Sequence, residues 1–312
     1  MILISRWSML FSLTVSLLYI SIYNIFLRKK IFSYYSTIPY MSLLIIVFAR
    51  LIFPFEFSWS YVIRSEKVFT RINDFLEYQL YKNLSIYQLL QLIWITGIFV
   101  SLFLYFRKIV LGIKWQKIII EEAHEIPSKY QHVLKKIGVR PRSIFFSDKI
   151  IEVINFGIIN NKILLPDIDY SDPELEGILL HEIEHVKHKD TLIKLVIHLA
   201  GCIFWWNPLL KRIEYDYSVL IEYQCDENVV KNYTEYEKIR YVETLKKLAV
   251  IRSDLVHDSC KVGFASVKKK SNLIDRAIHI FQGNYKKKHG LLAIISFELL
   301  AFFISYFIVI QP

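Results

Sequence analysis

The chain has 312 residues, of which 54% are hydrophobic and 22% charged, and its formal net charge is +10. This apolar content exceeds that of a typical soluble domain and indicates a membrane protein. The basic residues do not gather on one recognisable module, so the positive charge favours contact with anionic lipid over direct nucleic-acid binding. The widely spaced cysteines, Cys202, Cys225 and Cys260, form neither a disulfide framework nor a CxxC metal motif, which indicates reducing surroundings.

Four apolar stretches are long enough to cross a bilayer as helices. They cover residues 7–27, 31–53, 86–106 and 289–312, and a loop of balanced charge at 54–85 separates the second from the third. Three basic clusters, at 28–30, 107–117 and 286–288, fall on one side of the membrane if all four stretches cross it. The positive-inside rule then predicts a membrane region over 1–106, a cytoplasmic domain over 107–288, and both termini outside.

The 107–288 segment is large enough for one domain of mixed helices and strands. Its first part, 115–138, has the pattern of a helix. Short runs rich in β-branched and aromatic residues then predict three strands, at 143–147, 150–154 and 162–166. Asn160 and Asn161, between the last two runs, indicate a hairpin turn.

The next predicted helix carries the most informative run of the chain, His181-Glu182-Ile-Glu-His185. Asp172 as N-cap and Pro173 at the first helical position predict where this helix begins, and it should continue to about residue 190. The i, i+4 spacing places both imidazoles on one helix face, where they can bind one Zn²⁺, and Glu182 can act as a base toward water. Because a chance HExxH is not rare, a third ligand is needed to support a zinc site.

Glu222 and Asp226 stand four residues apart on a further predicted helix. Glu222 would complete a His-His-Glu site with the fourth position open to water, and Asp226 could accept a hydrogen bond from a ligand histidine. Glu214 and Asp216 compete with Glu222 as third ligand. Glu222 is preferred because only it is paired with a supporting acid one helical turn on.

Two other residues near the HExxH run are not expected to bind the metal. His188 lies on the same helix as the first two ligands, where three ligands have poor geometry, so it should contact other groups or solvent. Asp190 comes late in the helix and should make a local polar contact.

The stretch 192–206 is unusually apolar but, at about fifteen residues, short for a membrane crossing. A crossing here would also put Glu222 on the opposite side of the membrane from His181, which is excluded if both bind one metal. We expect a helix on the inner leaflet or packed on the membrane helices, with Trp205 and Trp206 at the headgroup level. An ordinary buried core helix is an equal alternative.

Taken together, three motifs resemble those of the membrane metallopeptidases of the BlaR/MecR type, the antirepressor signal transducers of β-lactam resistance. The motifs are His181-Glu-Ile-Glu-His185, Trp206-Asn207-Pro208-Leu209-Leu210 and Glu222-Tyr-Gln-Cys-Asp226-Glu227. The strand end at Leu164-Leu165-Pro166 and the four-span plan are also similar to that family. The resemblance implies a gluzincin-like α+β domain on four transmembrane helices, with zinc bound by His181, His185 and Glu222. It implies Glu182 as catalytic base and Asp226 as a supporting residue.

The resemblance also implies a role in signal transduction at the bacterial plasma membrane during the antibiotic response. The expected substrate is a transcriptional repressor of the winged-helix kind, the transducer itself, or both. Receptors of this family carry an extracellular penicillin-binding domain after the fourth span, but no Ser-x-x-Lys acylation motif stands outside the membrane here. We therefore expect the signal to be sensed by the 54–85 loop, the membrane helices or a partner protein. The sequence does not decide whether the chain forms a homodimer.

The expected reaction is zinc-assisted peptide hydrolysis, with the substrate extended along the strand that ends near Pro166. Glu182 would take a proton from water and pass it to the leaving amine. Tyr217 and Arg212 are candidates for the oxyanion donor between which the sequence does not decide. Two other functions compete: a general quality-control or processing protease of the membrane, and a non-catalytic receptor or scaffold with structural zinc. The Trp-Asn-Pro run argues against the first and the intact Glu182 against the second.

Overall fold

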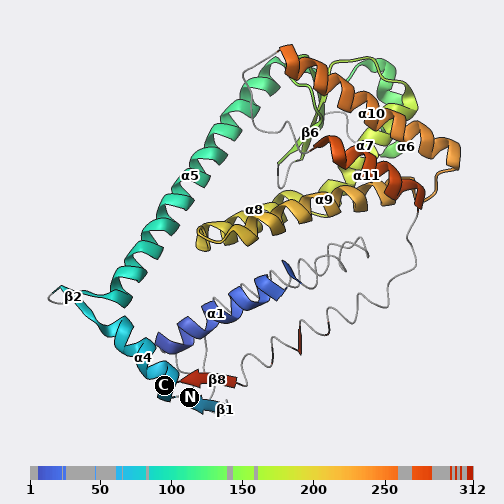
Figure 1. Ribbon diagram of the computed structural model, residues 1–312. Coiled ribbons are helices and arrows are strands. Elements are labelled where there is room, and N and C mark those ends of the chain that lie inside the picture. Colours follow the sequence, from blue (N-terminus) through green and yellow to red (C-terminus); the bar gives the residue numbers. More distant parts are fainter. Residues whose placement is uncertain are drawn as a thin grey trace. The chain divides into compact units, whose positions relative to one another are not determined.

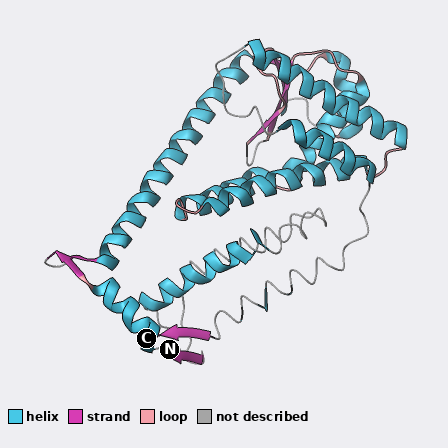
Figure 2. Ribbon diagram, in the orientation of Figure 1, coloured by secondary structure: helices cyan, strands magenta, loops and turns pink. Residues whose placement is uncertain are grey.

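The computed structural model describes residues 6–22, 24–25, 46, 61–64, 66–81, 84–138, 143–157, 161–258, 269–282, 296, 299–300, 303 and 308–311. Over these residues the chain is mostly helical, with a few short strands (Figure 2). Its internal contacts divide it into two compact units. The first comprises Met1–Tyr105, Ile197–Tyr217 and Tyr285–Pro312, and the second comprises Phe106–Val196 and Ser218–Asn284.

Figure 1 labels most of the elements of both units. The first unit contains α1 (Arg6–Ile22), β1 (Tyr61–Arg64), α4 (Glu66–Glu77), β2 (Gln79–Tyr81), β3 (Leu84–Ser85) and β8 (Ile308–Gln311). The second contains β4 (His124–Glu125), the 3-10 helix η2 (Ser128–Tyr130), α6 (Gln131–Ile137), β5 (Ile144–Ser147), β6 (Ile154–Phe156), β7 (Lys162–Pro166), α7 (Asp172–Lys187), α10 (Glu235–Asp258) and α11 (Lys269–Gln282). Three helices contribute residues to both units: α5 (Ile86–Glu122), α8 (Asp190–Ile203) and α9 (Pro208–Val230).

Among the described helices, α5 is the one that is long and apolar enough to cross a membrane. It runs for 37 residues and so continues well beyond the span predicted at 86–106. Many of its apolar side chains are exposed; Phe99 and Phe103, for example, keep 68% and 67% of their surface exposed. Exposed apolar surface of this kind is expected where lipid covers a helix.

The other predicted spans are described only in part. α1 covers most of the first, 7–27. The second, 31–53, lies outside the described residues apart from residue 46, and so does most of the fourth, 289–312. The described end of the fourth stretch is the strand β8, which pairs in parallel with β1.

The apolar stretch 192–206 falls on α8 and the turn into α9, and the tip of this helical hairpin packs on α5 within the first unit. Trp94 Nε1 donates a hydrogen bond to the carbonyl oxygen of Ile203 at 2.9 Å. The indole of Trp205 lies so close to Gly97 that a Cβ there would overlap it, so α5 needs glycine at this crossing. The sequence left open whether the 192–206 stretch lies on the inner leaflet, packs on the membrane helices or is buried in a core. These contacts support its packing on an apolar helix.

A four-stranded sheet of order β4-β5-β7-β6 forms one part of the second unit. β5 and β7 are parallel, whereas β4 and β6 run antiparallel to their neighbours. The antiparallel pairing of β6 with β7 confirms the hairpin predicted between them. The strand predicted at 150–154 is wrong, because the strand begins at Ile154 and Ile150 is instead buried in a small apolar cluster with Ile119 and Leu164.

The helix predicted over 115–138 is also wrong as a single element. α5 ends at Glu122, the chain pairs with β5 through β4, and a new helix starts after Pro127. Proline cannot continue a helix from the preceding turn, which explains the break.

α7 packs against both α6 and α10. It begins one residue earlier than predicted, since Ser171 rather than Asp172 is its N-cap. The Glu174 carboxylate accepts a hydrogen bond from the Ser171 backbone N–H at 2.8 Å, the reciprocal contact of a capping box. The buried face of α7 joins the main core, which holds Ile126, Tyr130, Val133, Leu134, Ile144, Phe146, Ile163, Leu165, Tyr170, Leu175, Ile178 and Leu179. A rigid helix therefore carries the HExxH run.

Candidate active site

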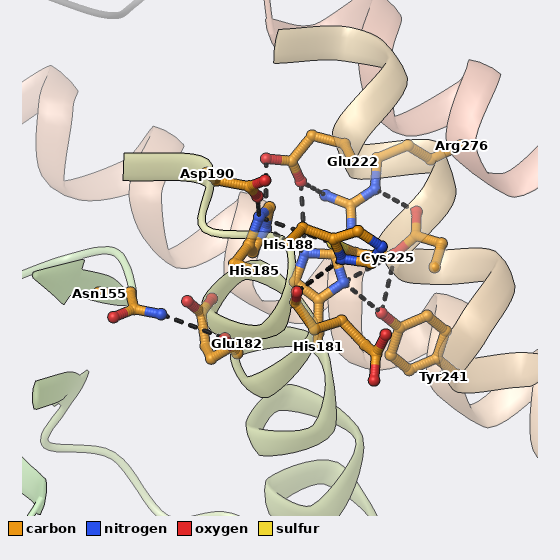
Figure 3. Close-up of polar contacts among 12 residues, drawn as sticks. Asn155, His181, Glu182, His185, His188, Asp190, Glu222, Cys225, Tyr241 and Arg276 are labelled. Carbon is orange, nitrogen blue, oxygen red and sulfur yellow. Dashed lines mark hydrogen bonds and ion pairs between the residues drawn. The ribbon is translucent and has the colours of Figure 1, made fainter. Parts of the chain in front are cut away.

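The two histidines of the HExxH run and Glu222 come together in the second unit (Figure 3). His181 and His185 lie one turn apart on α7, with their Nε2 atoms 3.1 Å from each other. α9 brings the Glu222 carboxylate to the same point, with Oε2 3.4 Å from His181 Nε2 and Oε1 3.7 Å from His185 Nε2. These donor atoms come from two helices that are separate in sequence.

The donor set and its spacing fit a four-coordinate metal ion. A tetrahedral ion bound at about 2.1 Å by nitrogen and oxygen separates its ligand atoms by about 3.4 Å. The three separations between 3.1 and 3.7 Å lie around this value. Three protein ligands leave one position for water or substrate, which is the arrangement of catalytic rather than structural sites.

A largely buried wall stands behind His181, formed by side chains from α9, α10 and α11. His181 Nδ1 lies 3.1 Å from Asp226 Oδ1 and 3.0 Å from the Tyr241 hydroxyl. The same hydroxyl donates to Asp226 Oδ1 at 2.8 Å. A hydrogen bond from Nδ1–H to the carboxylate fixes the tautomer in which the Nε2 lone pair faces the candidate metal position.

Arg276 of α11 completes this wall. Its Nε and Nη2 atoms donate to the two oxygens of Asp226, each at 2.6 Å, and its Nη1 lies 3.0 Å from Glu222 Oε2 (Figure 3). One guanidinium thus neutralises part of the charge of two carboxylates. Two-pronged pairs of this kind fix geometry as well as charge.

The pKa shifts of these groups follow from their mutual contacts. Burial alone would lower the pKa of His181, but its hydrogen bonds to Asp226 and Glu222 raise it to about 10. Burial opposes ionisation of Asp226, yet Arg276 and His181 lower its pKa to about 2. Arg276 and His181 likewise hold the pKa of Glu222 well below its usual range against the effect of burial. Metal binding at His181 would therefore release a proton, as is general for histidine ligands.

His185 has different surroundings. Its Nδ1 contacts the carboxylate of Asp190, the first residue of α8. Cys225 Sγ lies 3.6 Å from the same nitrogen, so His185, Asp190 and Cys225 form a second group that could hold a metal ion. Burial raises the pKa of the Cys225 thiol, which disfavours the thiolate that a metal requires. The group containing Glu222 is therefore the better candidate.

A cleft of about 500 Å³ opens beside His185. Glu182 lines it, and burial raises the pKa of this carboxyl group. On the facing side, Asn155 of β6 donates through Nδ2 to the Glu182 carbonyl oxygen at 3.1 Å, which ties the strand to α7. The full lining is Val153, Asn155, Gly157, Asn161, Glu182, His185, Val186, Lys189, Asp190, Thr191, Leu192, Lys194 and Glu222.

Comparison with known proteins identifies the family. Residues 6–280, which include every residue of the site, match the family described as BlaR1 peptidase M56. The chain belongs to this family.

Two curated relatives of this M56 family chain share its sequence at a moderate level. The methicillin resistance mecR1 protein of Staphylococcus aureus (strain Mu50) is 29% identical over 187 residues, which is 57% of this chain and 31% of the relative. The regulatory protein BlaR1 of Bacillus licheniformis is 26% identical over 211 residues, or 66% of this chain and 32% of the relative. The M56 chain thus spans about a third of the length of these relatives.

The other candidates from the sequence lie elsewhere in the M56 chain. His188 contacts the Glu184 carbonyl oxygen through Nδ1 and Gln224 through Nε2, and it does not belong to either candidate metal group of the described residues. Glu214 pairs with His198 at 3.3 Å in the first unit. The remaining rivals, Asp216, Tyr217 and Arg212, also belong to the first unit, and none is among the residues lining the described cleft.

The expected position of the substrate needs correction. β7, the strand ending at Pro166, is paired on both sides, with β5 and with β6, so no peptide can add to it. In the described sheet, the edge strand next to Glu182 is β6. Which strand lies at the edge of the sheet depends on the order of the strands, and the residue pattern of a single strand does not predict that order.

Two side chains of the M56 site were not foreseen from the sequence. Tyr241 and Arg276 lie 60 and 95 positions after His181, and no spacing rule connects them to the HExxH run. One signal was present for Arg276: it shares a helix face with Leu273 and Ile280, at i, i+3 and i+7, and an arginine on an apolar stripe requires a buried partner. The sequence contains no comparable signal for a role of Tyr241 in the site.

Proposed function

We propose that this chain is an integral membrane zinc endopeptidase in which His181, His185 and Glu222 bind the metal. The observation that carries the proposal is the meeting of three donor side chains, whose nearest atoms lie 3.1–3.7 Å apart, beside a cleft that Glu182 also lines. Nitrogen and carboxylate donors in tetrahedral spacing suit Zn²⁺. A structural zinc would need a closed ligand set, whereas this one opens on a cleft.

The chain's own residues have distinct parts in peptide hydrolysis. Zinc, when bound, supplies a Lewis acid that polarises a carbonyl and makes water more acidic. Glu182 is the general base: it accepts the proton of the attacking water and gives it to the leaving amine. A carboxyl whose pKa is raised by burial suits both halves of this exchange. Asp226 and Asp190 hold the imidazoles of His181 and His185 in the ligating tautomer.

The edge strand β6 is the proposed support for the scissile peptide. An extended substrate can add to a sheet edge through main-chain hydrogen bonds, while its side chains enter neighbouring pockets. Asn155 links β6 to the carbonyl oxygen of Glu182, so a peptide on this edge would lie against the catalytic base. This geometry favours cleavage within an extended or unfolded segment.

The membrane arrangement proposed for the chain has four spans, with the peptidase domain in the cytoplasm. The length and exposed apolar surface of α5 support one crossing. The three basic clusters support one orientation for all four. A cytoplasmic domain gives the protease access to intracellular proteins.

The biological role we infer is signal transduction at the bacterial plasma membrane. The names of the two relatives, methicillin resistance mecR1 protein and regulatory protein BlaR1, support a regulatory protease. The proposed substrate is a cytoplasmic transcriptional repressor, the chain itself, or both. Cleavage of a repressor would convert a membrane event into gene expression.

The test compares the zinc-loaded wild-type chain with Glu182→Gln. The variant should keep its metal but lose about 10²–10⁴-fold in kcat on a quenched fluorescent peptide, because it lacks the proton acceptor. In cells, one or a few cytoplasmic proteins should be cut only by the wild type. Equal activity of the two proteins would refute the role of Glu182, and broad accumulation of damaged membrane proteins in the variant strain would refute the regulatory role.

A further inference from the structure

The turn between α7 and α8 contains an unusual backbone position. Lys189 has φ of 54°, the only positive φ of a non-glycine residue in the described part of the chain. The left-handed region is unfavourable for a residue with a long side chain, and glycine or asparagine is the usual occupant. Such strained positions cluster at functional sites.

The surrounding hydrogen bonds hold Lys189 in this conformation. Its N–H donates to the Val186 carbonyl oxygen at 3.0 Å, and its own carbonyl accepts from Leu192 and Ile193 at 2.9 and 3.1 Å. Lys189 therefore ends α7 and caps the N-terminus of α8 at once. A cation at a helix N-terminus opposes the helix dipole, and lysine is not among the residues preferred as N-cap.

Three local preferences thus disfavour lysine at a position where a small polar residue would serve the fold. Residues that break local rules without a structural gain are expected at functional sites. Lys189 lines the cleft together with Glu182, His185 and Glu222. Lys189 therefore borders the space that a substrate would fill.

The charge of the cleft favours an acidic substrate. Its lining contains three carboxylates, on Glu182, Asp190 and Glu222, and two lysines, Lys189 and Lys194. The charge of a bound metal ion has to be included in this balance. With a doubly charged ion, the positive charges of the ion and the two lysines exceed the negative charges of the three carboxylates. A peptide with an acidic side chain close to the scissile bond would then be attracted.

We propose that Lys189 is a substrate-binding residue that makes this protease prefer an acidic side chain near the bond it cuts. This inference rests on the proposed function, because it assigns a substrate class to the same cleft. On this proposal, the strained turn is retained because it places a lysine at the lining of the cleft. Lys194 adds to the same positive potential without sharing the strained backbone.

The experiment uses the full chain in detergent, loaded with Zn²⁺, and a set of quenched fluorescent peptides. The peptides are identical except for Glu, Gln or Lys at one of the three positions on each side of the scissile bond. For the wild type, Glu should exceed Lys in kcat/KM about fivefold at one position, mainly through KM, as expected for a partly exposed ion pair. Lys189→Asn should abolish this preference, and Lys189→Glu should reverse it.

Stability separates a binding role from a structural one. Asparagine tolerates a positive φ and is a preferred N-cap, so Lys189→Asn should raise Tm by about 2–4 °C while weakening the charge preference. Lys187→Asn is the matched control, since Lys187 is exposed on the last turn of α7, pairs with Glu184 and does not line the cleft. It should leave the charge preference unchanged.

The outcomes distinguish this inference from the proposed function. If the wild type cuts Glu, Gln and Lys peptides equally at every position, the role of Lys189 is overturned and the peptidase activity stands. A preference that survives in Lys189→Asn, or an equal fall in kcat for all peptides, also overturns it. If the metal-loaded wild type cuts none of the peptides, the inference and the proposed activity fall together.

Discussion

His181 and His185 present their Nε2 atoms to one point, yet the two sides of that point are built differently. Behind His181, Asp226 and Tyr241 are buried and Arg276 is partly buried, and His181, Tyr241 and Arg276 all contact the Asp226 carboxylate. Beside His185, Asp190 at the start of α8 and the Cys225 thiol contact Nδ1 of the ring, and the cleft opens next to it. The wall is fixed when the domain folds, whereas the cleft side stays available to a substrate.

The difference shows how a polar cluster can be stable and reactive at once. On the wall side, charge is matched by charge within hydrogen-bond distance, so little rearrangement is needed when a metal binds. On the cleft side, Glu182 and Lys189 face space that a peptide would fill. Changes on the wall should therefore affect mainly folding and metal affinity, and changes on the cleft side should affect mainly turnover and selectivity, with a smaller effect on metal affinity.

The largest expected effect is on stability, from removing the charge that holds the wall together. Arg276→Met leaves Asp226 and Glu222 without their cation, and should lower the free energy of unfolding by about 3 kcal/mol. Thermal or urea unfolding of the metal-free chain measures this. Arg240→Met is the control, since Arg240 lies over the Tyr236 ring away from the site, and it should cost under about 0.5 kcal/mol. Similar losses in both variants would contradict a special role for the wall.

The next effect is on metal affinity, and it decides between the two candidate groups. Glu222→Gln should weaken zinc binding by more than about 100-fold, because a ligand is lost. Cys225→Ser should change affinity by less than about threefold. Competition with a zinc-binding dye measures both. The opposite ranking would assign the metal to His185, Asp190 and Cys225 instead.

A smaller change in metal affinity is expected on the cleft side. Asp190→Asn keeps a polar group beside His185 Nδ1 but removes its charge, and should weaken zinc binding by about 10–100-fold. Asp172→Asn provides the comparison, because this exposed aspartate pairs with His132 at the start of α7. If both variants bind zinc like the wild type, Asp190 does not orient His185.

The smallest expected effect concerns the link between the edge strand and α7. Asn155→Ala removes one partly buried hydrogen bond, worth about 1 kcal/mol, and should lower kcat/KM about fivefold with zinc affinity unchanged. Steady-state kinetics on a single peptide measures this. Asn228→Ala loses a comparable bond, to Glu184 outside the cleft, and should leave kcat/KM as it is.

The parts of the site that lie close in sequence could be predicted from it. The i, i+4 rule places His181 and His185 on one helix face, and the same rule on α9 singles out Glu222 and Asp226. The structure brings Glu222 to both histidines and Asp226 to His181. The placement of each pair on one helix face could be predicted because helical spacing is a local property, whereas the roles of these residues in metal binding stay predictions.

The parts that depend on packing could not be predicted. Arg276 and Tyr241 reach Asp226 only because α10 and α11 fold back on α9. Ile150 resembled a strand residue, but burial against Ile119 overrides its β preference. The choice of Ser171 over Asp172 as N-cap turns on one hydrogen bond to Glu174, since either residue type is acceptable there.

The contact between Gly97 and Trp205 has a consequence for the order in which the chain is assembled during synthesis. The nearby bond from Trp94 to Ile203 joins residues 109 positions apart. At a synthesis rate of about 5–20 residues per second, α5 leaves the ribosome roughly 5–20 seconds before its docking partner exists. Trp205 can therefore reach Gly97 only after that interval, and the packing of its indole on α5 is a late step in the maturation of the protein.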